Sequence, residues 1–264
     1  MGEVLLVEDR GSVRRMTLNR PDKLNALDSA LVEALSIALT SAADDEEVRV
    51  LVIAGAGRSF CAGYDLTEDS ASDSAGARDA LMRSLDRLLE IFDHPKPVIA
   101  EVHGHCLAGG CDLMMMCDLA IASDDAVFGQ PEIRFGSTVV AQVMPWLIGA
   151  RRAKELLFTG HDTLGAGEAE RIGLVNRVVP IDDLQDTTMS LARQLAVVDP
   201  VAMSLTKRAI NRSWELAGFR EALIAGAEIG AIIESARVPE REEFERIAAE
   251  KGLKEALRWR DERF

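Results

Sequence analysis

The sequence predicts an α/β fold: a core of alternating strands and helices, followed by an all-helical C-terminal region. Short apolar runs, bounded by glycine, proline or polar residues, alternate with amphipathic segments up to about residue 179, which is typical of strands between helices. From residue 181 onward the apolar residues keep helical spacing, and no run has the pattern of a strand. We therefore divide the chain into an α/β core, residues 1–198, and a helical region, residues 199–264.

The composition is that of an ordinary globular protein. With 264 residues, 48% hydrophobic and 28% charged, the chain can bury a substantial core. No apolar run approaches the ~20 residues of a membrane helix, and the N-terminus lacks a basic stretch followed by an apolar one. These features predict a cytoplasmic protein without a membrane partner.

Charge and cysteine usage narrow the function classes further. The chain carries 30 basic and 44 acidic residues, a formal net charge of −14, and such a field repels nucleic acid. No nucleic-acid partner is therefore expected. The four cysteines form no Cys-x-x-Cys pair, so buried, reduced thiols are expected, as in a reducing compartment.

The first elements follow from local signals. Residues 4–7 and 13–18 are predicted to be two strands joined around a glycine turn. After a polar loop broken by proline, Asp28 or Ser29 caps a helix, because apolar residues then recur at helical spacing. Residues 49–54 lack the alternation of a half-exposed strand, so we expect this strand to be central in a sheet.

A glycine-rich turn is the most informative stretch of the core. Residues 67–79, rich in small and polar residues, predict a mobile surface stretch before a helix over residues 80–92. A buried strand over residues 97–102 then enters residues 103–112, from which a buried helix begins. A helix N-terminus presents unpaired backbone N–H groups and favours negative charge. We therefore expect this turn to hold a developing oxyanion.

The remaining core elements are predicted from the same signals. The order strand, strand, helix recurs, although no repeat is visible in the residues themselves. The predicted elements are strands over residues 119–122 and 174–179, an extended segment over residues 126–133, and helices over residues 139–148 (with Pro145 as a break), 151–159 and 166–172.

One helix of the C-terminal region is apolar on every side. Residues 222–233 are apolar or glycine at every position except Glu228. This is more apolar surface than one chain covers by itself. Oligomerisation is the natural use of such a helix.

Two glycine-bearing loops after strands supply the parts of a two-donor oxyanion hole. They are residues 62–65 and residues 108–110. Backbone donors need a close approach of the chain to the substrate, which a side chain at a glycine position would block. Two acids, Asp112 and Glu132, follow at positions where strand and helix ends bring them together for proton transfer.

Four motifs, in this order, carry a family resemblance: Asn19-Arg20-Pro21-x-x-x-Asn25-Ala26-Leu27, Ser59-Phe60-Cys61-Ala62-Gly63-Tyr64-Asp65-Leu66, the stretch over residues 103–112, and Phe128-Gly129-Gln130-Pro131-Glu132. Together they resemble the crotonase superfamily, the enoyl-CoA hydratase/isomerase family. Each motif alone is weak, but their order and spacing extend over essentially the whole chain. The resemblance implies a crotonase-like ββα superhelix (spiral) core with a helical C-terminal trimerisation region, assembled as homotrimers or dimers of trimers.

The resemblance also implies the ligand and the site residues. The ligand is an acyl-CoA thioester, with coenzyme A as part of the substrate and no separate cofactor or metal. The N–H groups of Tyr64 and Gly109 match the donors to the thioester oxygen, each worth roughly 3–4 kcal/mol by analogy with other oxyanion holes. Glu132 and Asp112 match the two glutamates that flank the α,β bond in hydratases. The positions implied to contact substrate or CoA are Lys23, Ala26, Ala62, Asp65 and Leu66.

The chain departs from the hydratase pattern at two places. The side chain of Asp112 is one methylene shorter than glutamate, which retracts the carboxylate by on the order of 1.5 Å. Either a water fills that gap, or only one of the two acids is effective in proton transfer. Residues 139–143 read Val-Val-Ala-Gln-Val where hydratases usually carry Pro-Gly-x-Gly-Gly. The wall beside the acids is therefore reshaped.

Simpler roles stand beside these for several residues. An acid in the first turn of a helix, such as Asp112, gains ~0.3–1 kcal/mol from the helix dipole without any chemistry. The Tyr64 side chain either lines the acyl tunnel or is incidental. Three basic side chains either meet CoA phosphates or are solvated surface charges: Arg20, Lys23 and Arg58.

The function predicted from the sequence is enoyl-CoA hydration, the reversible addition of water to a trans-2-enoyl-CoA through an enolate-like state. Glu132 transfers the proton and Asp112 orients or activates the water. One alternative is different chemistry in the same superfamily, either Δ3-Δ2 enoyl-CoA isomerisation, which needs a single carboxylate, or thioester hydrolysis. Another is an acyl-CoA-binding relative without catalysis.

Overall fold

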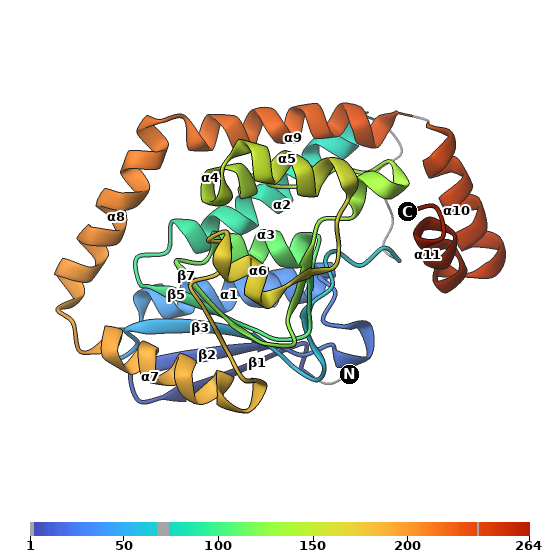
Figure 1. Cartoon of the computed structure of the whole chain (residues 1–264). Helices are drawn as coiled ribbons and strands as arrows, with labels where there is room; N and C mark the ends of the chain where they lie inside the picture. The colour runs from blue at the N-terminus through green and yellow to red at the C-terminus, as the bar shows by residue number, and fades with distance from the viewer. Residues whose placement is uncertain (1–2, 68–73, 237) are drawn as a thin grey trace.

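Two sheets of unequal size organise the chain in the computed structural model, which describes residues 3–67, 74–236 and 238–264 (Figure 1). The larger sheet has the order β1-β2-β3-β5-β7-β10 and the smaller one β4-β6-β8-β9. The larger sheet consists of β1 (Leu5–Arg10), β2 (Val13–Leu18), β3 (Val50–Gly55), β5 (Val98–Val102), β7 (Leu119–Ser123) and β10 (Arg177–Val179). The smaller sheet consists of β4 (Ser59–Cys61), β6 (His105–Leu107), β8 (Val127–Gly129) and β9 (Leu164–Gly165).

Consecutive strands alternate between the two sheets. β3 lies in the larger sheet and β4 in the smaller one, and α2 (Ser74–Phe92) follows them; β5, β6 and α3 (Gly109–Met116) repeat this order. The recurring strand, strand, helix order predicted from the sequence is confirmed. β4, β6 and β8 are parallel neighbours, so their carboxyl ends meet at one edge of the smaller sheet. The crotonase-like core predicted from the sequence is built from these turns.

The larger sheet is buried on both faces. In β3, Leu51 and Ile53 belong to the main hydrophobic core, whereas Val50 and Val52 belong to a second apolar cluster under α7 (Leu184–Ala196). β3 lies between β2 and β5, which confirms the central position expected from its lack of alternation. On the core face, α1 (Ser29–Asp44) is capped by the Asp28 carboxylate, which accepts a hydrogen bond from the Leu31 N–H.

The helical region wraps around this core (Figure 1). α8 (Pro200–Leu216) leads to α9 (Phe219–Ser235), which crosses the molecule along α2, and α10 (Pro239–Lys251) with α11 (Leu253–Asp261) lies at the far end. α10 and α11 enclose a small apolar cluster of their own. Within the described residues, no helix is both long and apolar enough to span a membrane.

The apolar helix of this region, α9, is covered on one side only. Phe219, Leu223 and Ala227 are buried in the main core, and α9 packs along α2. Ile229 and Ile232, on the other side, are 61% and 69% exposed. This exposed side is the surface for which the sequence predicts oligomerisation.

Several element boundaries differ from the predictions. α2 begins at Ser74, so the surface stretch predicted over residues 67–79 is wrong for residues 74–79; residues 68–73 lie outside the described part of the chain. Buried Ala77 shows that packing stabilises this turn despite its small and polar composition. Of the helix predicted over residues 139–148, only α4 (Met144–Ile148) forms, since the backbone before it bonds to a side chain described below.

The other helices agree with the predictions to within a few residues. The predicted strand over residues 174–179 shortens to β10, because the N–H groups of Leu174 and Val175 bond to Ala169 O at the end of a helix. The remaining helices are α5 (Ala150–Thr159), α6 (Ala166–Arg171) and the short 3-10 turns η1 (Pro21–Lys23), η2 (Glu132–Phe135) and η3 (Ile181–Asp183).

An ion pair with a buried lysine attaches α8 to the core. The Lys207 Nζ lies 2.7 Å from Asp118 Oδ2 and also donates to the carbonyl oxygens of Ile91 and Lys96, each at 3.3 Å. Asp118 Oδ2 accepts a further hydrogen bond of 2.8 Å from the Val98 N–H, where β5 begins. The side chain of Lys207 is only 8% exposed, so the position of α8 depends on this contact.

Replacing this lysine tests its structural role. We expect Lys207→Met to lower the free energy of unfolding by roughly 2–4 kcal/mol, somewhat less than for a fully buried pair, because Asp118, whose side chain is 22% exposed, is left without its cation. Urea unfolding followed by circular dichroism measures the change. The matched control is Arg212→Met on the same helix. The Arg212 side chain is 63% exposed and pairs with Glu215, and this pair contributes about 0–0.5 kcal/mol to the free energy of unfolding. Equal losses in the two variants would contradict the assignment.

Candidate active site

The candidate site residues come together at one edge of the smaller sheet. Tyr64 follows β4, Gly109 and Asp112 follow β6, and Glu132 follows β8. Because these three strands are parallel neighbours, the segments after them emerge side by side. The carboxyl edge of parallel strands is where ligands bind in many α/β proteins.

The two predicted oxyanion donors are free in the described part of the chain. The Leu27 N–H bonds to Gly63 O at 2.8 Å and the Asp65 N–H to Leu27 O at 3.0 Å, so the N–H of Tyr64 between them points to the opposite side. Gly109 is the first residue of α3, where no intrahelical acceptor exists. Neither N–H donates to a protein atom among residues 3–67, 74–236 and 238–264.

A strained alanine sets the direction of the second donor. Ala108 has φ 52° and ψ −129°, a conformation that residues with a side chain rarely adopt. Its N–H bonds to Gly129 O at 2.8 Å, and its carbonyl accepts from the N–H groups of Cys111 and Asp112. The turn is thereby fixed on both sides, and with it the position of the N–H of the next residue, Gly109.

The glycine pair of this turn is required by packing within the protein. A Cβ atom on Gly109 would lie 2.5 Å from Cε2 of Tyr64, and one on Gly110 would lie 2.4 Å from Cys61 O. From the sequence alone, these glycines are expected to allow a close approach of the substrate. In the structure, the loop over residues 61–64 already occupies the space.

The Tyr64 side chain belongs to this packing. Its ring rests on Gly109 and lines a narrow cavity of about 20 Å³, together with Leu27 and Leu113, between α1 and α2. Burial first, and then the nearby Asp112 carboxylate, raise the pKa of the phenol, so it stays neutral. The ring therefore keeps the loop over residues 62–65 in contact with the turn over residues 108–110.

Asp112 is completely buried next to these donors. Its Oδ1 accepts a hydrogen bond of 2.9 Å from Gln130 Nε2, and its Oδ2 accepts one of 3.4 Å from the Ala141 N–H. Burial raises the pKa of Asp112 to about 7, although the bonds from Gln130, Ala141 and Val140 oppose this. Near neutral pH the group is therefore present in both protonation states.

Glu132 is the second buried acid. It is 7% exposed, and its Oε2 has no hydrogen-bond partner within the described residues. Burial raises its pKa well above the usual range, and the Asp112 carboxylate raises it further, while Arg260 opposes both effects. A pair of buried acids with raised pKa values is typical of proton-transfer sites.

Residues of the first two motifs mainly hold the loop over residues 62–65, which carries the Tyr64 N–H. The Arg20 guanidinium lies 2.8 Å from Asp65 and 3.0 Å from Asp28 and is 15% exposed, so its charge is paired within the protein and is not a solvated surface charge. Buried Asn25, at φ 55°, donates to Ser59 O at 2.7 Å. Burial favours a raised pKa for Asp65, but bonds from Thr67 and Arg20 outweigh it and lower the pKa to about 2.

The predicted CoA contacts lie around this loop. Lys23, on η1, and Arg58 are exposed, and Leu66 is 48% exposed, whereas Ala26 and Ala62 are half-buried. Their contacts with substrate, and that of the ion-paired Asp65, stay predictions.

Several groups that surround the acids are not predicted from the sequence. Gln130 stands inside a quoted motif, only two residues before Glu132, so its closeness to that acid in the sequence is a usable signal. The Ala141 N–H and the Arg260 side chain left no such signal, because backbone donors and contacts across the chain depend on the fold.

The fold and this site together define a class of protein. The ββα turns, with two buried acids and two free N–H groups at one sheet edge, are the arrangement implied by the crotonase resemblance. The sequence profile of the enoyl-CoA hydratase/isomerase family matches residues 8–234. The chain belongs to the enoyl-CoA hydratase/isomerase family.

Individual relatives agree with this assignment. A short-chain-enoyl-CoA hydratase of Clostridium acetobutylicum is 39% identical over 217 residues, 80% of this chain and 82% of the relative. A crotonyl-CoA hydratase of Syntrophomonas wolfei is 37% identical over 219 residues, 81% of this chain and 83% of the relative. The crystal structure of an enoyl-CoA hydratase/isomerase from Xanthobacter autotrophicus Py2 superposes with a TM-score of 0.96, at 39% identity, over 99% of this chain and 98% of the other.

The raised pKa of Asp112 predicts how stability depends on pH. Its value of about 7 exceeds the usual 3.8, so the folded state binds the proton more tightly and stability falls as pH rises between these values. We expect Asp112→Asn, which removes the buried charge, to have a higher melting temperature than the wild type at pH 8. The difference shrinks toward pH 5, where the wild-type carboxyl is protonated. Calorimetry at the two pH values measures this, and a pH-independent difference would contradict it.

Proposed function

We propose that the protein is an enoyl-CoA hydratase, which adds water across the double bond of a trans-2-enoyl-CoA thioester. The observation that carries the proposal is the pair of buried acids, Asp112 and Glu132, beside two free backbone N–H groups. Relatives named short-chain-enoyl-CoA hydratase and crotonyl-CoA hydratase support it.

The N–H groups of Tyr64 and Gly109 polarise the thioester. Both donate to the thioester oxygen, which gains negative charge as the enolate-like state forms. The N-terminus of α3 adds its positive dipole end at the same place. Donors that are fixed before the reaction need no reorganisation, and each contributes roughly 3–4 kcal/mol to the transition state.

The two acids divide the addition of water. Glu132, kept protonated by burial and by Asp112, delivers its proton to the α carbon. Asp112, with its pKa of about 7, is ionised in part near neutrality and accepts a proton from the water whose hydroxyl joins the β carbon. Exchange with solvent then returns one proton to Glu132 and removes one from Asp112.

A second candidate is Δ3-Δ2 enoyl-CoA isomerisation. Both oxygens of Asp112 have protein donors, whereas Glu132 Oε2 has none in the described residues. Isomerisation moves one proton between two carbons, and Glu132 alone serves that chemistry. Mass spectrometry of a panel of 2-enoyl- and 3-enoyl-CoA esters separates the outcomes: gain of water, isomer formation, or release of free CoA by thioester hydrolysis.

We further propose a homotrimer or a dimer of trimers that needs no cofactor beyond the CoA of its substrate. Exposed apolar residues on the two long helices, Leu205 and Leu216 on α8 and Ile229 and Ile232 on α9, support the oligomer. The four free cysteines are compatible with the predicted cytoplasmic location.

Loss of the general acid tests the proposed function directly. We expect Glu132→Gln to reduce hydration of crotonyl-CoA by at least about 10²-fold, since the amide has no proton to transfer. Binding of the CoA ester, measured by calorimetric titration, is expected to survive. Unchanged hydration in this variant would overturn the proposed role of Glu132.

Adding a single methyl group at Gly109 tests the turn over residues 108–110. We expect Gly109→Ala to lower kcat by on the order of 10²-fold, because its Cβ collides with the Tyr64 ring and displaces the donors. The matched control is Gly167→Ala on α6, where an added Cβ meets no atom within 4 Å and activity is expected to stay at the wild-type level. Steady-state kinetics compares the two, and equal activity would refute the packing argument.

A further inference from the structure

The backbone segment over residues 137–142 lies directly on α9. A Cβ atom on Gly230 would be 2.9 Å from Thr138 Cγ2, and one on Gly226 would be 3.1 Å from Gln142 Cγ. These two glycines, one helical turn apart, let the segment approach the helix closely. The same segment supplies the Ala141 N–H that donates to Asp112 Oδ2.

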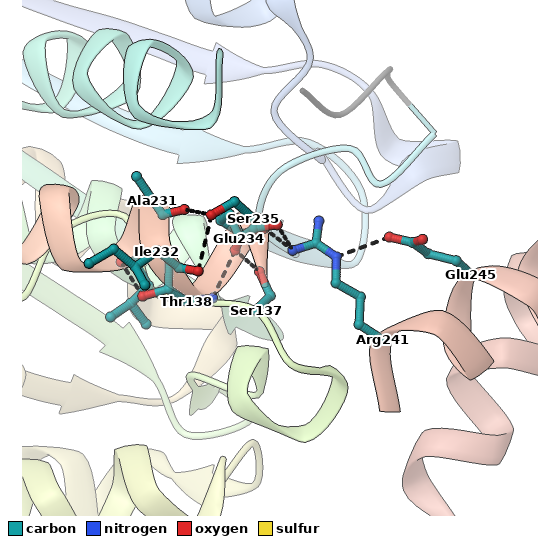
Figure 2. Close-up of polar contacts among 9 residues, drawn as sticks. Ser137, Thr138, Ala231, Ile232, Glu234, Ser235, Arg241 and Glu245 are labelled. Atoms are coloured by element: carbon teal, nitrogen blue, oxygen red, sulfur yellow. Dashed lines mark hydrogen bonds and ion pairs between the residues drawn. The ribbon is translucent and has the colours of Figure 1, made fainter. Parts of the chain in front are cut away.

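One carboxylate at the end of α9 binds the start of this segment, as Figure 2 shows. Glu234 Oε1 accepts hydrogen bonds from the Ser137 hydroxyl at 2.5 Å and from the Thr138 N–H at 3.0 Å. The side chain of Glu234 is 18% exposed, so these bonds are largely shielded from water.

The other oxygen of this carboxylate is held by α10. Arg241 Nη1 lies 2.6 Å from Glu234 Oε2 and donates to the Glu234 carbonyl at 2.7 Å (Figure 2). Its Nε donates to Glu245 at 3.0 Å. Arg241 thus fixes the carboxylate in one orientation, with Oε1 facing the segment.

α10 also rests on the turn that carries Glu132. Phe244 stacks on Phe135 of η2, with ring centroids 5.1 Å apart. A Cβ atom on Gly136 would lie 2.7 Å from Val238 Cγ2 and 3.3 Å from Arg241 Cβ. The helix, the turn and the segment over residues 137–142 therefore form one continuous contact.

We propose that Glu234 is a positioning residue for Asp112: by holding Ser137 and Thr138, it keeps the Ala141 N–H against the Asp112 carboxylate. The contact at Asp112 Oδ2 is 3.4 Å long, so a small shift of the segment removes it. Asp112 then loses a donor that stabilises its ionised form. The kinetic test of this positioning role rests on the proposed hydratase function.

The charged and titratable groups near Asp112 and near Glu234 are few, so their effects can be distinguished. Glu132 and the Tyr64 phenol face Asp112. Arg241 faces Glu234, and the charge of Glu234 also acts on Glu132, which Arg260 faces from α11. Removing the charge of Glu234 therefore affects Glu132 in any variant, whereas only the loss of its acceptor oxygen releases the segment.

Three variants separate these effects. Glu234→Ala removes the charge and the acceptor, Glu234→Gln removes the charge but keeps an oxygen for Ser137 and Thr138, and Glu245→Gln changes only the outer partner of Arg241. Full-length proteins are compared by melting temperature, by kcat and KM for crotonyl-CoA hydration, and by the pH dependence of kcat.

We expect Glu234→Ala to lower kcat by on the order of 10-fold with KM within about twofold, and to move the acidic limb of the kcat profile to higher pH. Glu234→Gln is expected to recover most of kcat, and Glu245→Gln to match the wild type. Equal losses in Glu234→Ala and Glu234→Gln, or wild-type kinetics in Glu234→Ala, would overturn the positioning role.

A second measurement does not depend on turnover. The Asp112 carboxyl is titrated by carbon-13 NMR, its signal being assigned by its absence in Asp112→Asn. We expect its apparent pKa to rise in Glu234→Ala and to stay near the wild-type value in Glu234→Gln; equal values in all proteins would refute the proposal. If the wild type hydrates no enoyl-CoA ester, the proposed function fails, while this titration still decides the role of Glu234.

Discussion

The burial of two carboxyl groups, neither of which forms an ion pair within the described residues, is the constraint on which the rest of the site depends. Desolvation disfavours both charges, and each charge disfavours the other. The protein offsets this cost at Asp112 with fixed neutral donors, Gln130 and the Ala141 N–H, and with the N-terminus of α3. Such donors stabilise charge only while they are held in place, so the surroundings have to be rigid.

The rigidity comes from the smaller sheet and from close backbone contacts. β4, β6 and β8 align the three segments that carry the site, and the bond from Ala108 to Gly129 O ties the second segment to the third. The Tyr64 ring fills the space beside Gly109. The strained backbone at Ala108 and the buried acids both cost stability. The larger sheet, which is buried on both faces, stabilises the whole domain and offsets this cost.

The sequence predicts those parts of this arrangement that leave a local signal. The central position of β3 follows from its lack of alternation, and the free N–H of Gly109 follows from a glycine turn that opens a helix. The glycines after the strands pair the two loops, and the choice of Tyr64 and Gly109 within them rests on the family resemblance. Contacts that depend on the fold, such as those of Ala141 and Glu234, left no pattern, and the start of α2 was missed because its first turn is formed from small residues.

The two departures from the hydratase pattern are connected in the structure. A shorter acid at position 112 retracts its carboxylate by on the order of one C–C bond toward its own helix. The segment over residues 139–143, which replaces a glycine-rich sequence, places the Ala141 N–H where it meets this retracted carboxylate. α9 accommodates the segment through Gly226 and Gly230. The aspartate and the altered wall are therefore coupled: the wall supplies a backbone donor to the carboxylate that the shorter side chain holds close to its own helix.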